Sequence, residues 1–464
     1  MVPLNLNITR KRALAIILIV MSIMIIDSSI VKFIAFGNKE LPTSLNVSIF
    51  TTFSILFVGI VIVLYRFVNR KDSDSELKRG FTAKYSHLII TLTLYSLIGI
   101  LVTIILQIIF MKSYNILLLF AAVYVSHISA TLFLIFLVLK SLDWLRTRRD
   151  KILSLYTISF SLTAIAIVTS LIYAVNVLSY QRSTIRPFPI HHALLDIPLS
   201  ELANSFGIAL DIISLLSFVS VWIATAALLS TYSRRMGKIR YWTIICIPLI
   251  YFLFPFQTYI LNISGPPITT SPVLTGLVNI LVFSATKQIG ALFFSLAFLA
   301  ASILVAINAI QKYLLISAIG MAILFGSIEI DSLLYAVYPP FGLVTILFMP
   351  LGSYLLFTGI FLSATFVARD RVLRKEFYKN AMSQLNLLKT IGVTEMEKEI
   401  IKSHKSIEKR TESFGIRDDQ LDKNNLREIL HDVVDEMDTD NVREILHDVL
   451  TEIYSKARAK PESS

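Results

Sequence analysis

The most regular feature of the chain is a series of long apolar runs separated by short polar segments. A helix of about 18 or more apolar residues is long enough to cross the hydrocarbon core of a bilayer. The sequence therefore predicts an all-α fold, a polytopic membrane helix bundle of about ten spans. The predicted spans are 13–36, 46–66, 88–111, 115–139, 153–179, 205–231, 242–262, 289–310, 313–329 and 344–368.

The stretch 276–310 is too long to be a single span. As one helix it would measure about 52 Å at about 1.5 Å per residue, against a hydrocarbon core of about 30 Å. Lys287 divides it, so we predict a short interfacial or re-entrant segment over 276–286 and a span that starts at 289. The chain then turns tightly at Gln311 and Lys312 into the next span.

The polar segments between the spans alternate in their content of basic residues. Those on one side carry 19 Lys and Arg residues, and those on the other side carry four. Because basic loops stay in the cytoplasm, this asymmetry predicts that both termini are cytoplasmic. Two glycosylation sequons, which begin at Asn46 and Asn262, fall on predicted outer ends and give this orientation mild support.

Composition agrees with the membrane class and argues against nucleic acid as a partner. Hydrophobic residues make up 55% of the chain and charged residues only 16%, whereas about 25% charged residues is typical of soluble domains. The net charge of +11 arises in the membrane part, where basic loops set the orientation. The single cysteine, Cys246, excludes an intramolecular disulfide.

The chain divides into a transmembrane domain, 1–368, and a cytoplasmic part with two sections. Residues 369–410 are predicted to form a juxtamembrane amphipathic helix, which opens with a basic cluster suited to anionic lipid headgroups. Residues 411–464 form a tail with an internal repeat, in which Asn425–Val433 recurs sixteen residues later as Asn441–Val449.

Each repeat begins with a helix-start pattern, Asn followed three residues later by Glu, and continues with an apolar stripe on one face. Two short amphipathic helices need a surface that buries these stripes. The two helices can pack on each other, on a second copy or on a partner, and we expect the region 425–453 to bind a cytoplasmic protein partner or to self-associate.

Ionisable residues within the predicted spans are the main candidates for function, because charge is costly inside a bilayer. They gather toward the outer side, at Asp27, Asp211, Lys287, Glu329 and Asp331. One interpretation is an outward-facing polar cavity in which Asp27 and Asp211 face Lys287. The alternative is that these groups pair structurally or extend to the interface.

His127 lies near the middle of the fourth predicted span. A lone histidine there is either a hydrogen-bonded packing residue or an intramembrane ligand or proton relay. The chain has no phosphate-binding glycine loop, no paired-histidine zinc helix and no Gly-x-Ser-x-Gly elbow. We therefore predict no catalytic residue, no metal site and no cofactor.

The segment from Tyr313 to Ile400 carries a family resemblance. It contains YLLISAIGMAILF, then VYPPFGLVTILFMPLGSYLLFTGIFLSA, then LRKEFYKN and LLKTIGVTEMEKEI. It resembles a family of uncharacterised multi-pass membrane proteins of ammonia-oxidising archaea (Thaumarchaeota). The resemblance implies an archaeal cell-membrane location and transfers no activity.

The sequence favours three functions, and an intramembrane enzyme stays open as a fourth. The first is a non-catalytic sensory or signalling protein, in which an outer cavity binds a ligand and the last span passes the change to the tail. The second is a secondary transporter of a small solute, suggested by the broken stretch around Lys287 and by prolines within spans. The third is a structural subunit of a membrane complex.

Overall fold

The computed structural model describes residues 10–36, 43–69, 81–147, 150–184, 201–230, 237–249, 288–302, 308–328 and 339–369. The chain divides into two compact units, Met1–Glu397 and Lys398–Ser464, and every described residue belongs to the first. The predicted juxtamembrane helix and the tail repeat lie outside the described residues.

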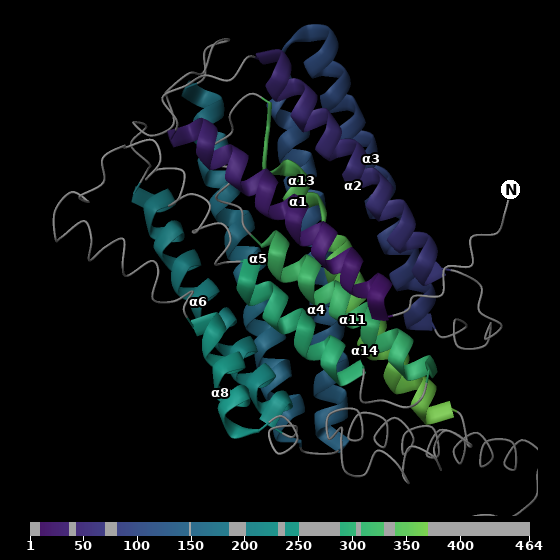
Figure 1. Ribbon diagram of the computed structural model, residues 1–464. Coiled ribbons are helices and arrows are strands. Elements are labelled where there is room, and N and C mark those ends of the chain that lie inside the picture. The colour runs from purple at the N-terminus through teal and green to yellow at the C-terminus, as the bar shows by residue number, and fades with distance from the viewer. Residues whose placement is uncertain are drawn as a thin grey trace, which may run out of the picture. The chain divides into compact units, whose positions relative to one another are not determined.

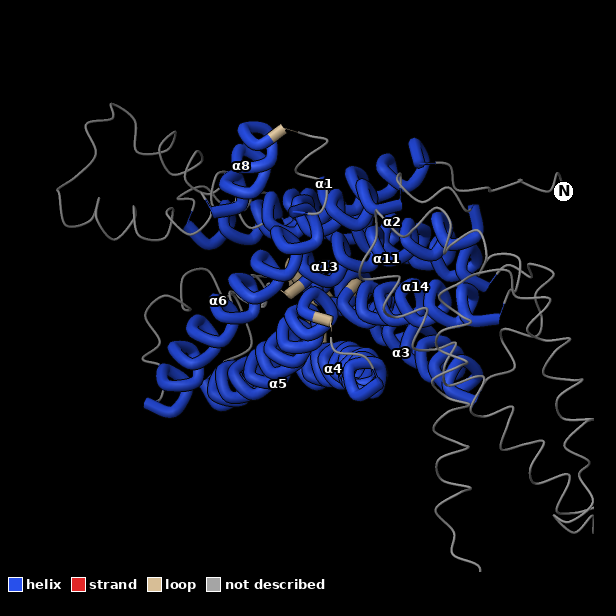
Figure 2. Tube along the Cα trace, turned by 90° about the horizontal axis from the view of Figure 1, so that it is seen from below, coloured by secondary structure: helices blue, strands red, loops and turns tan. Residues whose placement is uncertain are grey.

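All regular secondary structure in the described part is helical (Figures 1 and 2). The first six predicted spans each correspond to one helix. These are α1 (Arg10–Phe36), α2 (Thr43–Asn69), α3 (Phe81–Met111), α4 (Ile116–Thr147), α5 (Lys151–Thr184) and α6 (Glu201–Ser230). Later elements are α8 (Lys238–Cys246), the 3-10 turn η2 (Ile247–Leu249), a helix over Gln288–Ser302, α11 (Asn308–Ser327), α13 (Leu343–Leu347) and α14 (Met349–Arg369).

Six of the described helices are long and apolar enough to cross a membrane: Ser44–Arg66, Tyr85–Met111, Ile116–Arg146, Lys151–Val177, Ser205–Ser230 and Leu343–Thr365. Except for the buried span Leu343–Thr365, they carry large apolar side chains on their outward faces, among them Leu92 at 73% exposure and Phe110 at 79%. Apolar faces of this kind suit contact with lipid and would aggregate in water. The all-helical membrane class is therefore confirmed, while the ten spans and the side of each terminus stay predictions.

The structure differs from the sequence prediction at one later turn. Gln311 and Lys312 lie inside α11, which begins at Asn308, so the chain does not turn at that pair. Two adjacent polar residues do not break a helix when neither is Pro or Gly. Of the predicted span 242–262, only the part up to Leu249 lies within the described residues.

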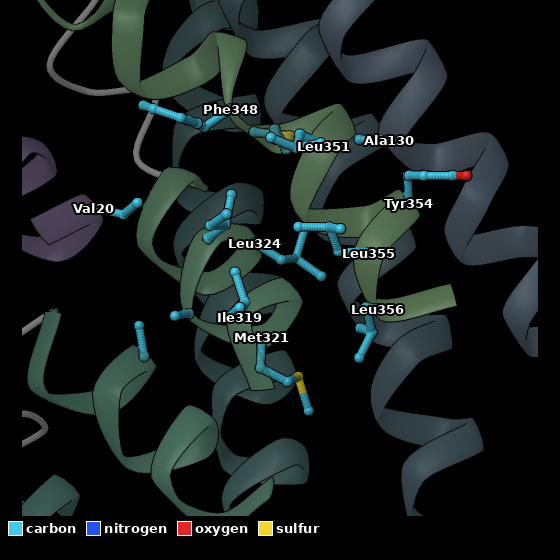
Figure 3. Packing of buried hydrophobic residues seen from close by; sticks show 14 of the residues in the cluster. Val20, Ala130, Ile319, Met321, Leu324, Phe348, Leu351, Tyr354, Leu355 and Leu356 are labelled. Atoms are coloured by element: carbon cyan, nitrogen blue, oxygen red, sulfur yellow. The ribbon is translucent and has the colours of Figure 1, made fainter. Parts of the chain in front are cut away.

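The central element is the broken span formed by α13 and α14. Every residue from Pro339 to Ile360 is buried, and the span contacts α1, α2, α3, α4 and α11. Because protein surrounds it, its side chains form the core and not a lipid-facing surface. Figure 3 shows Leu351, Leu355 and Leu356 of α14 in this cluster, together with Ile319 and Leu324 of α11 and Ala130 of α4.

The helices α11 and α14 pack backbone to backbone, and glycines allow this approach. A Cβ on Gly320 would lie 2.5 Å from the backbone nitrogen of Leu356, and one on Gly352 would lie 2.6 Å from that of Leu324. Gly320 comes before Leu324 on α11, but their partners Leu356 and Gly352 follow in the reverse order on α14. The two helices are therefore antiparallel. Glycines at a helix interface allow close van der Waals contact, which is the main attraction between helices in lipid.

This packing predicts that Gly352→Ala destabilises the protein, because the new methyl group has no room beside the α11 backbone. We expect a loss of about 1–3 kcal/mol, as for other overpacked sites, measured by thermal unfolding in detergent or nanodiscs. Gly99→Ala on α3 is the matched control, since a Cβ there meets nothing within 4 Å. Equal melting temperatures for the two variants would contradict the close approach.

Candidate functional site

α1 passes beside α13 (Figure 1), and its Asp27 binds the N-terminal end of α13. Its Oδ1 accepts a hydrogen bond from the Gly342 backbone N–H at 3.3 Å. Its Oδ2 accepts two more, from the Thr345 backbone N–H at 3.2 Å and from Thr345 Oγ1 at 2.6 Å. The Asp27 side chain is completely buried. The carboxylate therefore has three donors at a place where water is excluded.

The start of α13 needs an acceptor from elsewhere in the chain. The first amide groups of a helix have no partner within it, and a Ser, Thr, Asp or Asn at the N-cap usually supplies one. Here the N-cap residue is Gly342, which has no side chain to do so. Asp27 takes this role from another helix, and its negative charge suits the positive end of the helix dipole.

The turn before α13 is fixed from a second side by α2. Gly342 adopts a left-handed conformation with φ of 83°, which favours glycine. The Phe341 N–H donates to the Pro339 carbonyl at 2.7 Å. The buried Phe341 ring packs edge-on against Phe50 of α2, with centroids 5.9 Å apart. The turn thus contacts both α1 and α2.

A second buried polar contact pairs a backbone carbonyl at the break between α13 and α14. Pro350 has no N–H, so the carbonyl four residues earlier, on Ile346, lacks its usual helical donor. The hydroxyl of Ser126 on α4 donates to this carbonyl at 2.7 Å. Beside the break, Phe348 packs edge-on against Phe57 of α2 at 4.6 Å between centroids. The kinked span therefore leaves no unpaired carbonyl at Ile346.

His127, next to Ser126, is completely buried. Its Nδ1 lies 2.9 Å from the Val123 carbonyl, to which it can only donate, and its Nε2 lies 3.4 Å from Ser170 Oγ on α5. Both ring nitrogens have a protein partner. These contacts are sufficient for a packing role between α4 and α5, and the relay or ligand interpretation stays a prediction.

The remaining residues of the predicted outer cavity are only partly described. Asp211 lies on an exposed face of α6, whereas Asp27 is buried against α13. Lys287, Glu329 and Asp331 lie outside the described residues. The cavity therefore stays a prediction, and the described contacts give Asp27 the role of a helix cap.

Sequence reasoning missed two residues of this site, Ser126 and Thr345. The signal for Thr345 was its place three residues after Gly342, where a helix N-terminus exposes an amide group. The signal for Ser126 was indirect, because Pro350 implies that some donor must reach Ile346. Neither signal identifies the partner helix.

Comparisons of the chain with protein-family models, with curated proteins and with solved structures gave no match.

The Asp27 cap predicts that Asp27→Asn lowers the stability of the protein. The amide would place an N–H group against the donors of α13, and a hydrogen bond to a charged group contributes roughly 1.5–3 kcal/mol. Thermal unfolding in nanodiscs measures the effect. Asp143→Asn, near the C-terminal end of α4, is the control, and a loss no larger than in this control would contradict the cap.

The Ser126 contact predicts a dependence on Pro350. Ser126→Ala removes the side-chain donor of the buried Ile346 carbonyl, and we expect a cost of about 1–3 kcal/mol. In a Pro350→Ala background the new N–H can bond Ile346, so the same Ser126 substitution should cost clearly less. Thermal unfolding of the four proteins tests this, and an equal cost in both backgrounds would contradict the account.

Proposed function

We propose that the chain is a non-catalytic sensory or signalling protein of the cell membrane, with both termini in the cytoplasm. In this proposal a signal at the outer side acts on the start of α13. The central span then carries the change to the cytoplasmic tail, where the repeat region 425–453 binds a protein partner or a second copy.

The observation that carries the proposal is that the central span is bound by Asp27 at its start and continues at its end into the predicted cytoplasmic part. Its first residues are held by Asp27 of α1. Its last helix, α14, ends at Arg369, where the predicted cytoplasmic part begins. A change that loosens or tightens the Asp27 cap therefore acts directly on the element that leads to the tail.

The packing of α14 supports transmission over this distance. A helix of 21 residues is about 31 Å long at about 1.5 Å per residue, which is close to the thickness of the hydrocarbon core. The backbone contacts of Gly320 and Gly352 join α14 to α11. Close-packed elements of this kind shift as rigid bodies between discrete arrangements and do not deform continuously.

One observation favours the second candidate, a secondary transporter. Broken helices in transporters direct the N-terminal ends of half-helices at anionic groups near the middle of the membrane. The break at Phe348 to Pro350 and the carboxylate of Asp27 at the start of α13 share those features. In this chain the anionic group belongs to the protein itself, and for that reason we favour signalling.

Hydrogen–deuterium exchange in nanodiscs distinguishes the two candidates. We compare the wild type with Asp27→Asn, and use Asp143→Asn as the control. Signalling predicts faster exchange in 339–348 and also in the tail, 370–464, because the whole span responds to loss of the cap. A change that stops at the break before Pro350 would contradict signalling and favour the transporter.

A further inference from the structure

Side chains from two other helices converge on Gly326, near the C-terminal end of α11. The position that a Cβ on this glycine would occupy lies 2.7 Å from Met24 Sδ, 2.9 Å from Gln288 Oε1 and 3.4 Å from Met21 Sδ. The two methionines belong to α1, which packs along α11 (Figure 1), and the glutamine begins the helix Gln288–Ser302. All three side chains are buried. Two thioether sulfurs and one amide oxygen therefore face the same point.

The orientation of the Gln288 amide is fixed by its contact with α11. Its Nε2 donates to the Gly326 carbonyl at 3.0 Å, and a carbonyl can only accept, so the amide cannot be reversed. Its Oε1 is buried and has no hydrogen-bond donor in the part of the chain that the structure describes. An acceptor left in this state is costly. The sulfur atoms beside it carry no hydrogen to donate. All three atoms thus offer electron pairs, and none offers a hydrogen.

A soft monovalent metal cation fits these three atoms best. Thioether sulfur is a ligand that selects Cu(I), whereas Mg²⁺, Ca²⁺ and Mn²⁺ prefer oxygen. Water could donate to the amide oxygen, but a buried water needs several polar partners and thioether sulfur is a weak acceptor. Among the described residues, no group of three or more His, Cys, Asp or Glu side chains could hold a metal ion. A site here would therefore depend on methionine sulfur, which histidine and cysteine motifs do not reveal.

Two features of the surroundings favour positive charge at this point. Asp27, also buried, follows Met24 by one turn of α1, about 4.5 Å further along the helix axis. Gly326 is next to the last residue of α11, and the C-terminal end of a helix carries a partial negative charge. A buried cation is costly unless opposite charge is near it. The carboxylate and the helix end both reduce that cost.

We propose that Met21, Met24 and Gln288 bind a soft monovalent metal cation of the Cu(I) class beside Gly326. Glycine at this position keeps a side chain away from the point on which the three ligand atoms converge. The bound cation would join α1 to the start of the helix Gln288–Ser302 at the end of α11. The proposal does not depend on the signalling function.

Equilibrium dialysis against micromolar Ag(I), a redox-stable cation of the same class, tests the site in the full-length protein. All variants carry Cys246→Ser, because an exposed thiol is itself a soft ligand. Met21→Leu with Met24→Leu, which nearly conserves volume, should bind one Ag(I) fewer per chain than the parent. Met321→Leu changes a buried methionine elsewhere on α11 (Figure 3) and should bind as the parent does. Equal binding by the parent and the Met21/Met24 variant would overturn the proposal.

Gly326→Ala provides a second measurement that keeps both sulfur atoms. The new methyl group would occupy the point of convergence, and the flexible methionine side chains can move aside to admit it. We expect this variant to lose the same Ag(I) as the double methionine variant. Gly99→Ala is the matched control, since a Cβ there meets nothing within 4 Å, and it should keep the ion. Ag(I) binding by Gly326→Ala equal to that of the parent would overturn the proposal.

Discussion

The hydrogen bonds between Asp27 and the start of α13 satisfy two needs that neither partner can meet alone. A buried carboxylate is costly unless donors surround it, and the first amides of a helix lack acceptors. Asp27 and Thr345 are 318 positions apart in the sequence, yet each supplies what the other lacks. These hydrogen bonds therefore join α1 to the central span. Loss of the Asp27 carboxylate leaves the first amides of α13 without an acceptor, and loss of those donors leaves the buried carboxylate without hydrogen bonds.

The rest of the central span follows from this attachment. Once α13 starts at Gly342, the turn residues fall between α1 and α2, where Phe341 meets Phe50. Pro350 then interrupts the helical hydrogen bonds, and Ser126 of α4 supplies the missing donor. Beyond the break, glycines bring α14 against the α11 backbone. The Asp27 and Ser126 contacts thus pair backbone groups that are buried from solvent, while the ring and glycine contacts pack the span against its neighbours.

The sequence predicts the helices well, because length and apolar character alone decide whether a segment can cross a bilayer. It also identifies Asp27, because a carboxylate in an apolar run is costly wherever it points. Its role as a cap could not be predicted, since this depends on which distant segment meets α1. Ser126 shows the same limit, because small hydroxyl residues are common in apolar helices and only the fold selects the one that reaches Ile346. At Asn46, the first residue of the predicted span 46–66, the structure adds what the sequon does not indicate: the residue lies in α2 with a buried side chain.

A double-mutant cycle between Asp27 and Thr345 tests the central claim most directly. Asp27→Asn and Thr345→Val each remove one side of the shortest hydrogen bond in the cap, and thermal unfolding gives the cost of each change and of both together. If the two residues act as one unit, the double variant loses less than the sum of the single losses, with a coupling of about 1 kcal/mol or more. Losses that add within about 0.5 kcal/mol would show that the two residues act independently, and would contradict the account.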